Sequence, residues 1–204
     1  MPTLPSGTAT RASRNAVRVY LRPPRASDRQ AFLAAVAASR QLHRGWVLPP
    51  ATAAGFATYL ARFAGPQSRN PARATNVGCL VCRADDDSPV GVYNLSEIVR
   101  GSFHSAYLGY YALAPHAAAG YMREGLALLL ALAYGRLKLH RLEANIQPSN
   151  APSIALVRRA GFTCEGFSRR YVKIGGRWRD HERYALLAEE FVDVRTSRRN
   201  RDLA

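Results

Sequence analysis

The stretch "YYALAPHAAAGYMREG", residues 110–125, constrains the fold of this chain more than any other. An apolar run ends at Pro115, crosses a turn of small residues and continues with the apolar spacing of a helix. A helix that begins there has first N–H groups without intrahelical acceptors and a partial positive charge. Small side chains let a ligand approach this backbone, and Gly120 can adopt conformations closed to other residues. The turn therefore fits a seat for phosphate or an ordinary strand-to-helix connection.

The bulk composition describes one globular domain with a basic surface. The chain has 204 residues, of which 48% are hydrophobic, and this suits a single domain with a substantial core. No apolar run reaches the roughly 18 residues that span a bilayer, so we expect no membrane association. The formal net charge of +15 predicts attraction to polyanions such as phosphate-bearing ligands, RNA or ribosomal surfaces.

The cysteines do not indicate a metal site or a disulfide framework. Cys79 and Cys82 lie in the predicted strand "NVGCLVCRA", where positions three apart face opposite sides. Cys164 is the third cysteine, and this sparse usage fits a reducing cytoplasm.

Strands and helices interleave along the chain, which predicts a mixed α/β domain over residues 16–192. We expect a disordered leader over 1–15 and a basic tail over 193–204. Ser27 and Gln30 form a predicted capping box at the first helix. Predicted strands cover 17–22, 77–83, 89–97, 102–113, 140–146, 162–167, 170–174 and 181–187, and predicted later helices cover about 51–64, 120–135 and 149–161.

Three further segments carry a family resemblance. These are "VRGSFHSAYLGY" (99–110), "NIQPSNAPSIALVRRAGF" (145–162) and "GGRWRDHERYAL" (175–186). Together with the small-residue turn they resemble the GNAT N-acetyltransferase superfamily, within it the RimJ/RimL branch, and RimJ-like members most closely. The resemblance runs from about residue 17 to residue 188. It implies a mixed sheet of about seven strands, helices on both faces, and central strands that separate around acetyl-CoA.

The resemblance implies a cofactor site made mainly of backbone. It assigns the phosphate loop to Ala117, Ala118, Ala119, Gly120, Tyr121 and Met122. The family usually has Arg/Gln-x-x-Gly-x-Gly/Ala there, and only the internal glycine is kept in this chain. Ala112 and Leu113 match the strand end whose backbone pairs with the pantetheine arm.

Residues of the predicted helix 149–161 complete the implied CoA site. Asn150 matches an asparagine that holds the pantetheine, and it is equally suited to cap the helix. Ser153 matches a proposed general acid for the CoA thiolate, or else it only satisfies backbone in the first turn. The superfamily's usual tyrosine would fall near Val157 and is absent. Arg158 and Arg159 either reach CoA phosphates or remain solvated.

Several carboxylates are candidates for the general base. An α-amino group has a pKa of about 8, so a carboxylate acting through water is sufficient to deprotonate it. Glu97 is the first candidate, ahead of Glu143 and Glu124, although Glu124 also suits the first turn of a helix as an offset to its dipole. Asn145 occupies the position of a catalytic glutamate in some relatives and faces the same way as Glu143 on the predicted strand.

The implied activity is acetylation of the N-terminal α-amino group of a ribosomal protein, with alanine as the expected first residue. The amine would attack acetyl-CoA directly in a ternary complex, with the oxyanion near the N–H of Leu113. One alternative is a small-molecule amine as acceptor. The other is a ribosome- or RNA-binding homologue with weak catalysis. The implied protein is cytoplasmic and either a monomer or a homodimer.

Overall fold

The computed structural model describes residues 17–65, 70 and 72–191, so the predicted leader 1–15 and tail 193–204 lie outside the described residues. Within that part, one seven-stranded sheet has the order β1-β2-β3-β4-β5-β7-β6. Its strands are β1 (Val19–Arg22), β2 (Val77–Arg83), β3 (Pro89–Val99), β4 (Ser105–Ala112), β5 (Arg141–Ile146), β6 (Thr163–Ile174) and β7 (Arg177–Leu187). All neighbouring pairs are antiparallel except β4 and β5.

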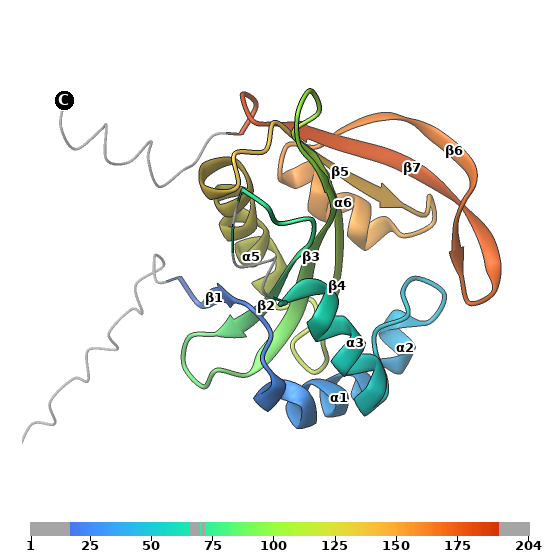
Figure 1. Cartoon of the computed structure of the whole chain (residues 1–204). Helices are drawn as coiled ribbons and strands as arrows, with labels where there is room; N and C mark the ends of the chain where they lie inside the picture. The colour runs from blue at the N-terminus through green and yellow to red at the C-terminus, as the bar shows by residue number, and fades with distance from the viewer. Residues whose placement is uncertain (1–16, 66–69, 71, 192–204) are drawn as a thin grey trace, which may run out of the picture.

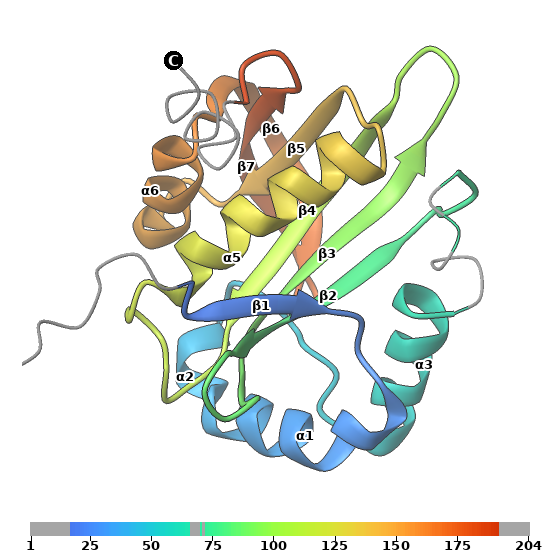
Figure 2. The same cartoon turned by 90° about the vertical axis from the view of Figure 1, so that its left-hand side faces the viewer.

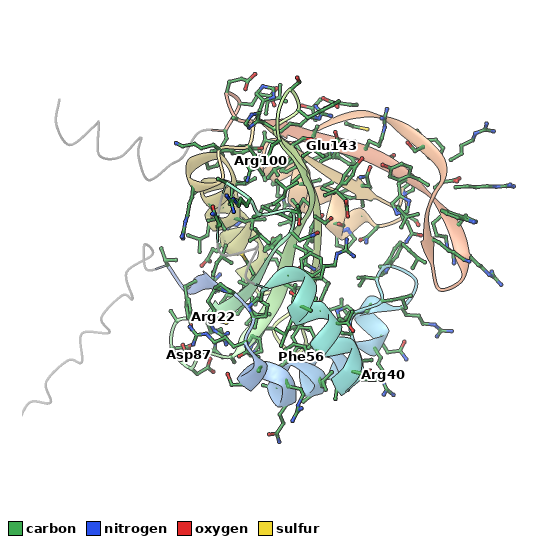
Figure 3. The ribbon with its side chains drawn as sticks, viewed as in Figure 1. Arg22, Arg40, Phe56, Asp87, Arg100 and Glu143 are labelled. Carbon is green, nitrogen blue, oxygen red and sulfur yellow. The ribbon has the colours of Figure 1, made fainter. Side chains whose placement is uncertain are left out.

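Helices cover both faces of this sheet (Figure 1). Figure 2 shows α5 lying across one face, with its first turn close to the beginning of β1. The helices α1 to α3 pack together away from α5, and Phe56 of α3 lies among them (Figure 3). The helical bounds are η1 (Ala26–Asp28), α1 (Arg29–Ala38), α2 (Arg40–His43), α3 (Ala53–Phe63), α5 (Tyr121–Leu130), the π-helical turn η2 (Ala131–Arg136) and α6 (Ala151–Arg159).

The core has two parts, one on each face of the sheet. The larger cluster includes Leu126 and Leu129 of α5, and the smaller one includes Phe32 of α1. Cys79 belongs to the larger cluster and Cys82 to the smaller, so the two thiols do face opposite sides of β2. This confirms the prediction that residues of this strand alternate between the two faces of the sheet. Burial raises the pKa of Cys79 to about 12.

Cap residues mark the start of α3 and both ends of α6, and the cap at Asn150 is one that the sequence predicts. Thr52 accepts a hydrogen bond from Gly55 N at the start of α3, and Asn150 accepts one from Ser153 N at the start of α6. Gly161, which follows α6, has φ +98°, a conformation that favours glycine at a helix end.

Three local predictions are wrong. The side chain that caps the start of η1 is that of Asp28, and the predicted pair Ser27 and Gln30 does not form the capping box. The Asp28 carboxylate accepts a hydrogen bond from Arg25 N at 2.6 Å and two more from the guanidinium of Arg22. The predicted strands 162–167 and 170–174 form one strand, β6, because a bulge absorbs the irregularity between Ser168 and Val172. Likewise, the predicted strand 181–187 begins earlier, at Arg177.

The two parallel strands at the centre of the sheet pair over only a short stretch. The register joins Ser105, Ala106 and Tyr107 of β4 to the segment 141–143 of β5, and it goes no further. Beyond these pairs β4 and β5 separate, as Figure 1 shows. Because ladder bonds alternate along a strand, the backbone groups of Tyr110 and Ala112 face this opening, which we call the β4–β5 gap.

Candidate functional site

The small-residue turn forms a concave row of backbone donors. Ala118 has φ +64° and Gly120 has φ +86°, so two left-handed residues flank Ala119. Such alternation turns successive N–H groups toward one side, as in anion-binding nests. Within the described part of the chain, the N–H groups of Gly120, Tyr121 and Met122 have no backbone or side-chain acceptor. These donors fit the diphosphate of CoA.

Arg18 lies against this turn and was not predicted. Its Nε donates to Glu124 Oε1 at 2.8 Å, and its Nη2 donates to the carbonyl of Ala119 at 3.1 Å. The guanidinium also lies 4.6 Å from the ring centroid of Tyr121. Glu124, a candidate base, is therefore engaged in an ion pair at the first turn of α5.

The N–H of Leu113, expected to lie near the oxyanion, is not available at the end of β4. The N–H of Leu113 donates to Val90 O at 2.8 Å, so it is already occupied by β3 and is not free to hold an oxyanion. Leu113 is fully buried in the core. The carbonyl of Ala112 accepts a hydrogen bond from His43 Nε2 at 2.7 Å. The free backbone donors toward the β4–β5 gap therefore precede Leu113.

Ser153 lies beside the gap and is tied to β4. Its Oγ is 2.5 Å from the hydroxyl of Tyr110, which also donates to the carbonyl of Ser153 at 3.2 Å. Burial raises the pKa of Tyr110 to about 12, so this hydroxyl stays protonated at neutral pH. Asn150 caps the same helical turn, so one helix start brings together Asn150, Ser153 and a tyrosine from β4.

Asn145 and Glu143 lie on the other side of the gap. The side-chain oxygen of Asn145 is buried and has no hydrogen-bond partner in the described part of the chain. Glu143, labelled in Figure 3, is bound by Arg141 at 2.8 Å. Glu143 and Glu97 line one cavity of about 220 Å³, together with Tyr107.

Glu97 and Arg158 lie away from the small-residue turn, residues 117–122, which we also call the phosphate turn after its proposed ligand. Glu97 is at the far end of β3, its side chain is 63% exposed, and it pairs with Arg62 at 3.1 Å. Arg158 lies in the last turn of α6, with its guanidinium 5.7 Å from the ring centroid of Tyr184. Among the described residues there is no cluster of three metal-binding side chains, and no helix long and apolar enough to cross a membrane.

The fold and the site together define a class of protein. Residues 18–163 match the family model of the acetyltransferase (GNAT) domain, and the chain belongs to this family. GNAT acetyltransferases use acetyl-CoA as the acetyl donor. The structure has N–H groups without acceptors in the small-residue turn, and parallel pairing of β4 with β5 that stops after Tyr107.

Two curated acetyltransferases are similar in sequence to part of the chain. The chain is 40% identical over 104 residues to the probable N-acetyltransferase YjcK of Bacillus subtilis, covering 51% of the chain and 58% of the relative. It is 38% identical over 111 residues to the [ribosomal protein uS5]-alanine N-acetyltransferase of Escherichia coli, covering 54% of the chain and 57% of the relative. These alignments therefore span little more than half the length of the curated relatives.

Solved structures match over most of the chain. Mycobacterium smegmatis RimJ in complex with CoA-disulfide has a TM-score of 0.76 at 27% identity and covers 84% of this chain and 83% of its own. The spermidine N-acetyltransferase of Vibrio cholerae in complex with CoA and spermine has a TM-score of 0.70 at 18% identity, with 86% and 98% covered. The second match shows the shared fold.

Proposed function

We propose that this chain transfers the acetyl group of acetyl-CoA to the N-terminal α-amino group of a protein, with an alanine-starting ribosomal protein as the foremost acceptor. The observation that carries the proposal is the β4–β5 gap, which has unpaired backbone donors at its phosphate end and Ser153 at its side. The similarity to the uS5-alanine acetyltransferase of Escherichia coli supports this choice of acceptor.

The donor would lie along the gap. In this proposal the loop 117–122 holds the diphosphate through its N–H groups, and the backbone of β4 up to Ala112 pairs with the pantetheine amides. Asn150 borders the pantetheine while it caps α6, and Arg158 contributes positive charge only at longer range. The thioester carbonyl then lies near the gap-facing amides that precede Leu113.

The chemistry is a direct transfer in a ternary complex. The neutral amine forms a C–N bond at the thioester carbon, and the C–S bond breaks as the tetrahedral intermediate collapses. The proton lost by the amine passes through water to a carboxylate, and the departing thiolate takes a proton from Ser153 Oγ. Ser153 then regains a proton from water and the carboxylate releases its own to solvent, so both groups return to their starting states. Asn145, with its unpartnered buried oxygen, accepts an N–H of the incoming amine and orients it.

Glu143 and Glu97 are the carboxylates proposed for the base. Glu143 lies on β5 where the parallel pairing with Tyr107 ends, next to the gap. Glu97 lines the same cavity but is more exposed. Position therefore favours Glu143, with Glu97 at the outer end of a water path.

One observation favours a second acceptor class, a small polyamine. Two carboxylates in one cavity of about 220 Å³ would attract a cationic amine. The structural likeness to the spermidine acetyltransferase is below 25% identity, so it adds only the fold. Each carboxylate is paired with an arginine, Glu143 with Arg141 and Glu97 with Arg62, so its remaining lone pairs suit the ammonium group of a peptide N-terminus equally well.

Basic residues on the β6–β7 hairpin support binding of this chain to ribosomal RNA close to the acceptor protein. The β6–β7 hairpin exposes Arg169, Arg170, Lys173 and Arg177, and Trp178 beside them is 59% exposed. Exposed arginines interleaved with an aromatic ring suit phosphate contacts and base stacking. Figure 3 shows long side chains projecting from this hairpin. We propose that the hairpin holds the enzyme on the ribosome while the acceptor N-terminus enters the site.

Acetyl transfer to two acceptors tests the proposal. We expect kcat/KM with a peptide that starts with alanine to exceed that with spermidine by at least about tenfold, a difference of about 1.4 kcal/mol in transition-state stabilisation. The same peptide with a blocked N-terminus provides the control. Preference for spermidine would replace the peptide acceptor by the polyamine. Failure to bind acetyl-CoA in calorimetry would refute both.

A further inference from the structure

The contacts of Arg18 join the start of β1 to the phosphate turn. Its backbone N–H donates to Glu124 Oε2 at 3.2 Å, and its side chain donates twice to Glu124 Oε1, at 2.8 and 2.5 Å. In addition, Nη2 donates to the carbonyl of Ala119 at 3.1 Å. Glu124 is in the first turn of α5, so the carboxylate fixes the guanidinium relative to that helix.

The bond to Ala119 fixes the orientation of one peptide group. A trans peptide is planar, and its C=O and N–H point in opposite directions. The carbonyl of Ala119 and the N–H of Gly120 belong to the same peptide group. When Arg18 holds this carbonyl on one side, the N–H of Gly120 must point to the other, together with the free N–H groups of Tyr121 and Met122.

This peptide group needs an external restraint. It joins Ala119 to Gly120, which has φ +86° and follows the left-handed Ala118. Glycine has a wide range of allowed backbone angles, so a peptide next to it rotates easily. Rotation would direct a carbonyl oxygen, instead of an N–H, at a bound phosphate. The family's polar first loop residue is absent here, since that position is Ala117.

We propose that Arg18 is a positioning residue for the CoA diphosphate. It acts by holding the Ala119–Gly120 peptide in the donor-inward orientation. Its charge is largely balanced by Glu124 at 2.5 Å, so its effect comes from geometry more than from net attraction. The inference rests on the proposed function of this turn as the diphosphate site.

The location of Arg18 also affects the design of variants at Gly120. A Cβ placed on Gly120 would lie 3.2 Å from Arg18 Nη2. A carboxylate introduced there would pair with Arg18 and would not only repel a phosphate. Substitution of Arg18 is therefore the cleaner probe of the turn.

The test compares three variants by calorimetry with CoA, which requires no acceptor. Arg18→Ala removes the hydrogen bonds of the side chain to Glu124 and to the carbonyl of Ala119. Arg18→Lys keeps the positive charge but cannot bind both groups at once as the guanidinium does. Arg123→Ala removes one charge from the same helical turn, where Arg123 is exposed. We expect the Kd for CoA to rise about tenfold in Arg18→Ala, as for loss of a charge-assisted hydrogen bond, and nearly as much in Arg18→Lys. Arg123→Ala should change it less than threefold.

Two further measurements separate positioning from other effects. A direct phosphate contact by Arg18 would lower the slope of log Kd against log salt in Arg18→Ala, whereas positioning leaves the slope unchanged. Turnover of acetyl-pantetheine, which lacks the nucleotide diphosphate, should be equal in the parent and Arg18→Ala, and a folding defect would lower it. An unchanged Kd in Arg18→Ala, full recovery in Arg18→Lys, or a reduced salt slope would each overturn the proposal. If the parent itself does not bind CoA, the proposed function fails instead.

Discussion

The hydroxyl of Tyr110 lies 2.5 Å from Ser153 Oγ and joins β4 to the first turn of α6. Its neighbour Tyr93 packs 5.6 Å away, between ring centroids, and donates to Met122 O at 2.6 Å in the first turn of α5. Two adjacent tyrosines thus each anchor the start of one helix at the gap. Ser153 alone is a weak acid, and a hydrogen bond from Tyr110 would stabilise its oxygen as it gives up a proton.

Removal of the Tyr110 hydroxyl should lower turnover more than cofactor affinity. We expect Tyr110→Phe to reduce kcat about tenfold and to change the Kd for CoA by less than about threefold, because in the proposed mechanism the hydroxyl assists proton transfer to the thiolate. Ser153→Ala should reduce kcat by at least as much, and the double variant should add little. Tyr93→Phe is the matched control, and it should mainly weaken CoA binding. Equal turnover in Tyr110→Phe and the parent would reduce Tyr110 to a structural role.

Loss of the base should change the pH dependence of the rate. Without a carboxylate relay, only amine that is already neutral reacts, and an α-amino group has a pKa of about 8. We therefore expect Glu143→Gln to lower kcat/KM strongly at pH 6–7 and little at pH 9, measured with an alanine-starting peptide. Glu97→Gln should shift the profile in the same direction but less. Identical profiles for both variants and the parent would exclude both carboxylates.

Gly91 has no room for a side chain. A Cβ there would lie 2.2 Å from Met122 Sδ and 3.1 Å from Tyr111 O, so the Met122 side chain would have to move and the contact with the β4 backbone would be tight. We expect Gly91→Ala to lower the free energy of unfolding by about 1–3 kcal/mol, as overpacking commonly does. Gly109→Ala, which meets nothing within 4 Å, is the control. Similar denaturant midpoints for the two variants would contradict this packing.

His181 should make stability fall in mild acid. The residue is 3% exposed, and desolvation lowers its pKa below the ordinary value of 6.5. The unfolded chain binds the proton more readily, so the stabilising effect is complete above about pH 6.5 and is lost as pH falls through the lower folded pKa. We expect His181→Asn to flatten the decline in Tm between pH 7.5 and pH 5. An undiminished decline in that variant would assign the acid sensitivity to other groups.

The sequence predicts most elements because their ends have local chemical signals. Thr52, Asn150 and Gly161 act on residues within a few positions, and strand alternation places Cys79 and Cys82 correctly on opposite faces. The β6 strand was read as two because both of its faces are largely exposed, so the usual alternation of apolar and polar residues is missing.

The contacts that build the site have no such signal. Arg18 and Glu124 are 106 positions apart, and Tyr110 and Ser153 are 43 apart. Periodicity describes the face on which a side chain lies but not its partner across the fold. For the same reason the sequence did not reveal that the N–H of Leu113 is taken by β3. The roles of the site residues remain predictions for the experiments above.

The short parallel register of β4 and β5 has a consequence for the mechanics of the molecule. Three residue pairs form the ladder between β4 and β5 in the described part of the chain, so few backbone hydrogen bonds hold the two halves of the sheet together at this seam. Acetyl-CoA bound in the gap would join the two halves of the sheet through hydrogen bonds to its pantetheine amides. Occupancy then raises the cost of opening at this seam, and amide hydrogens along β5 and β7 should exchange more slowly while the substrate is present.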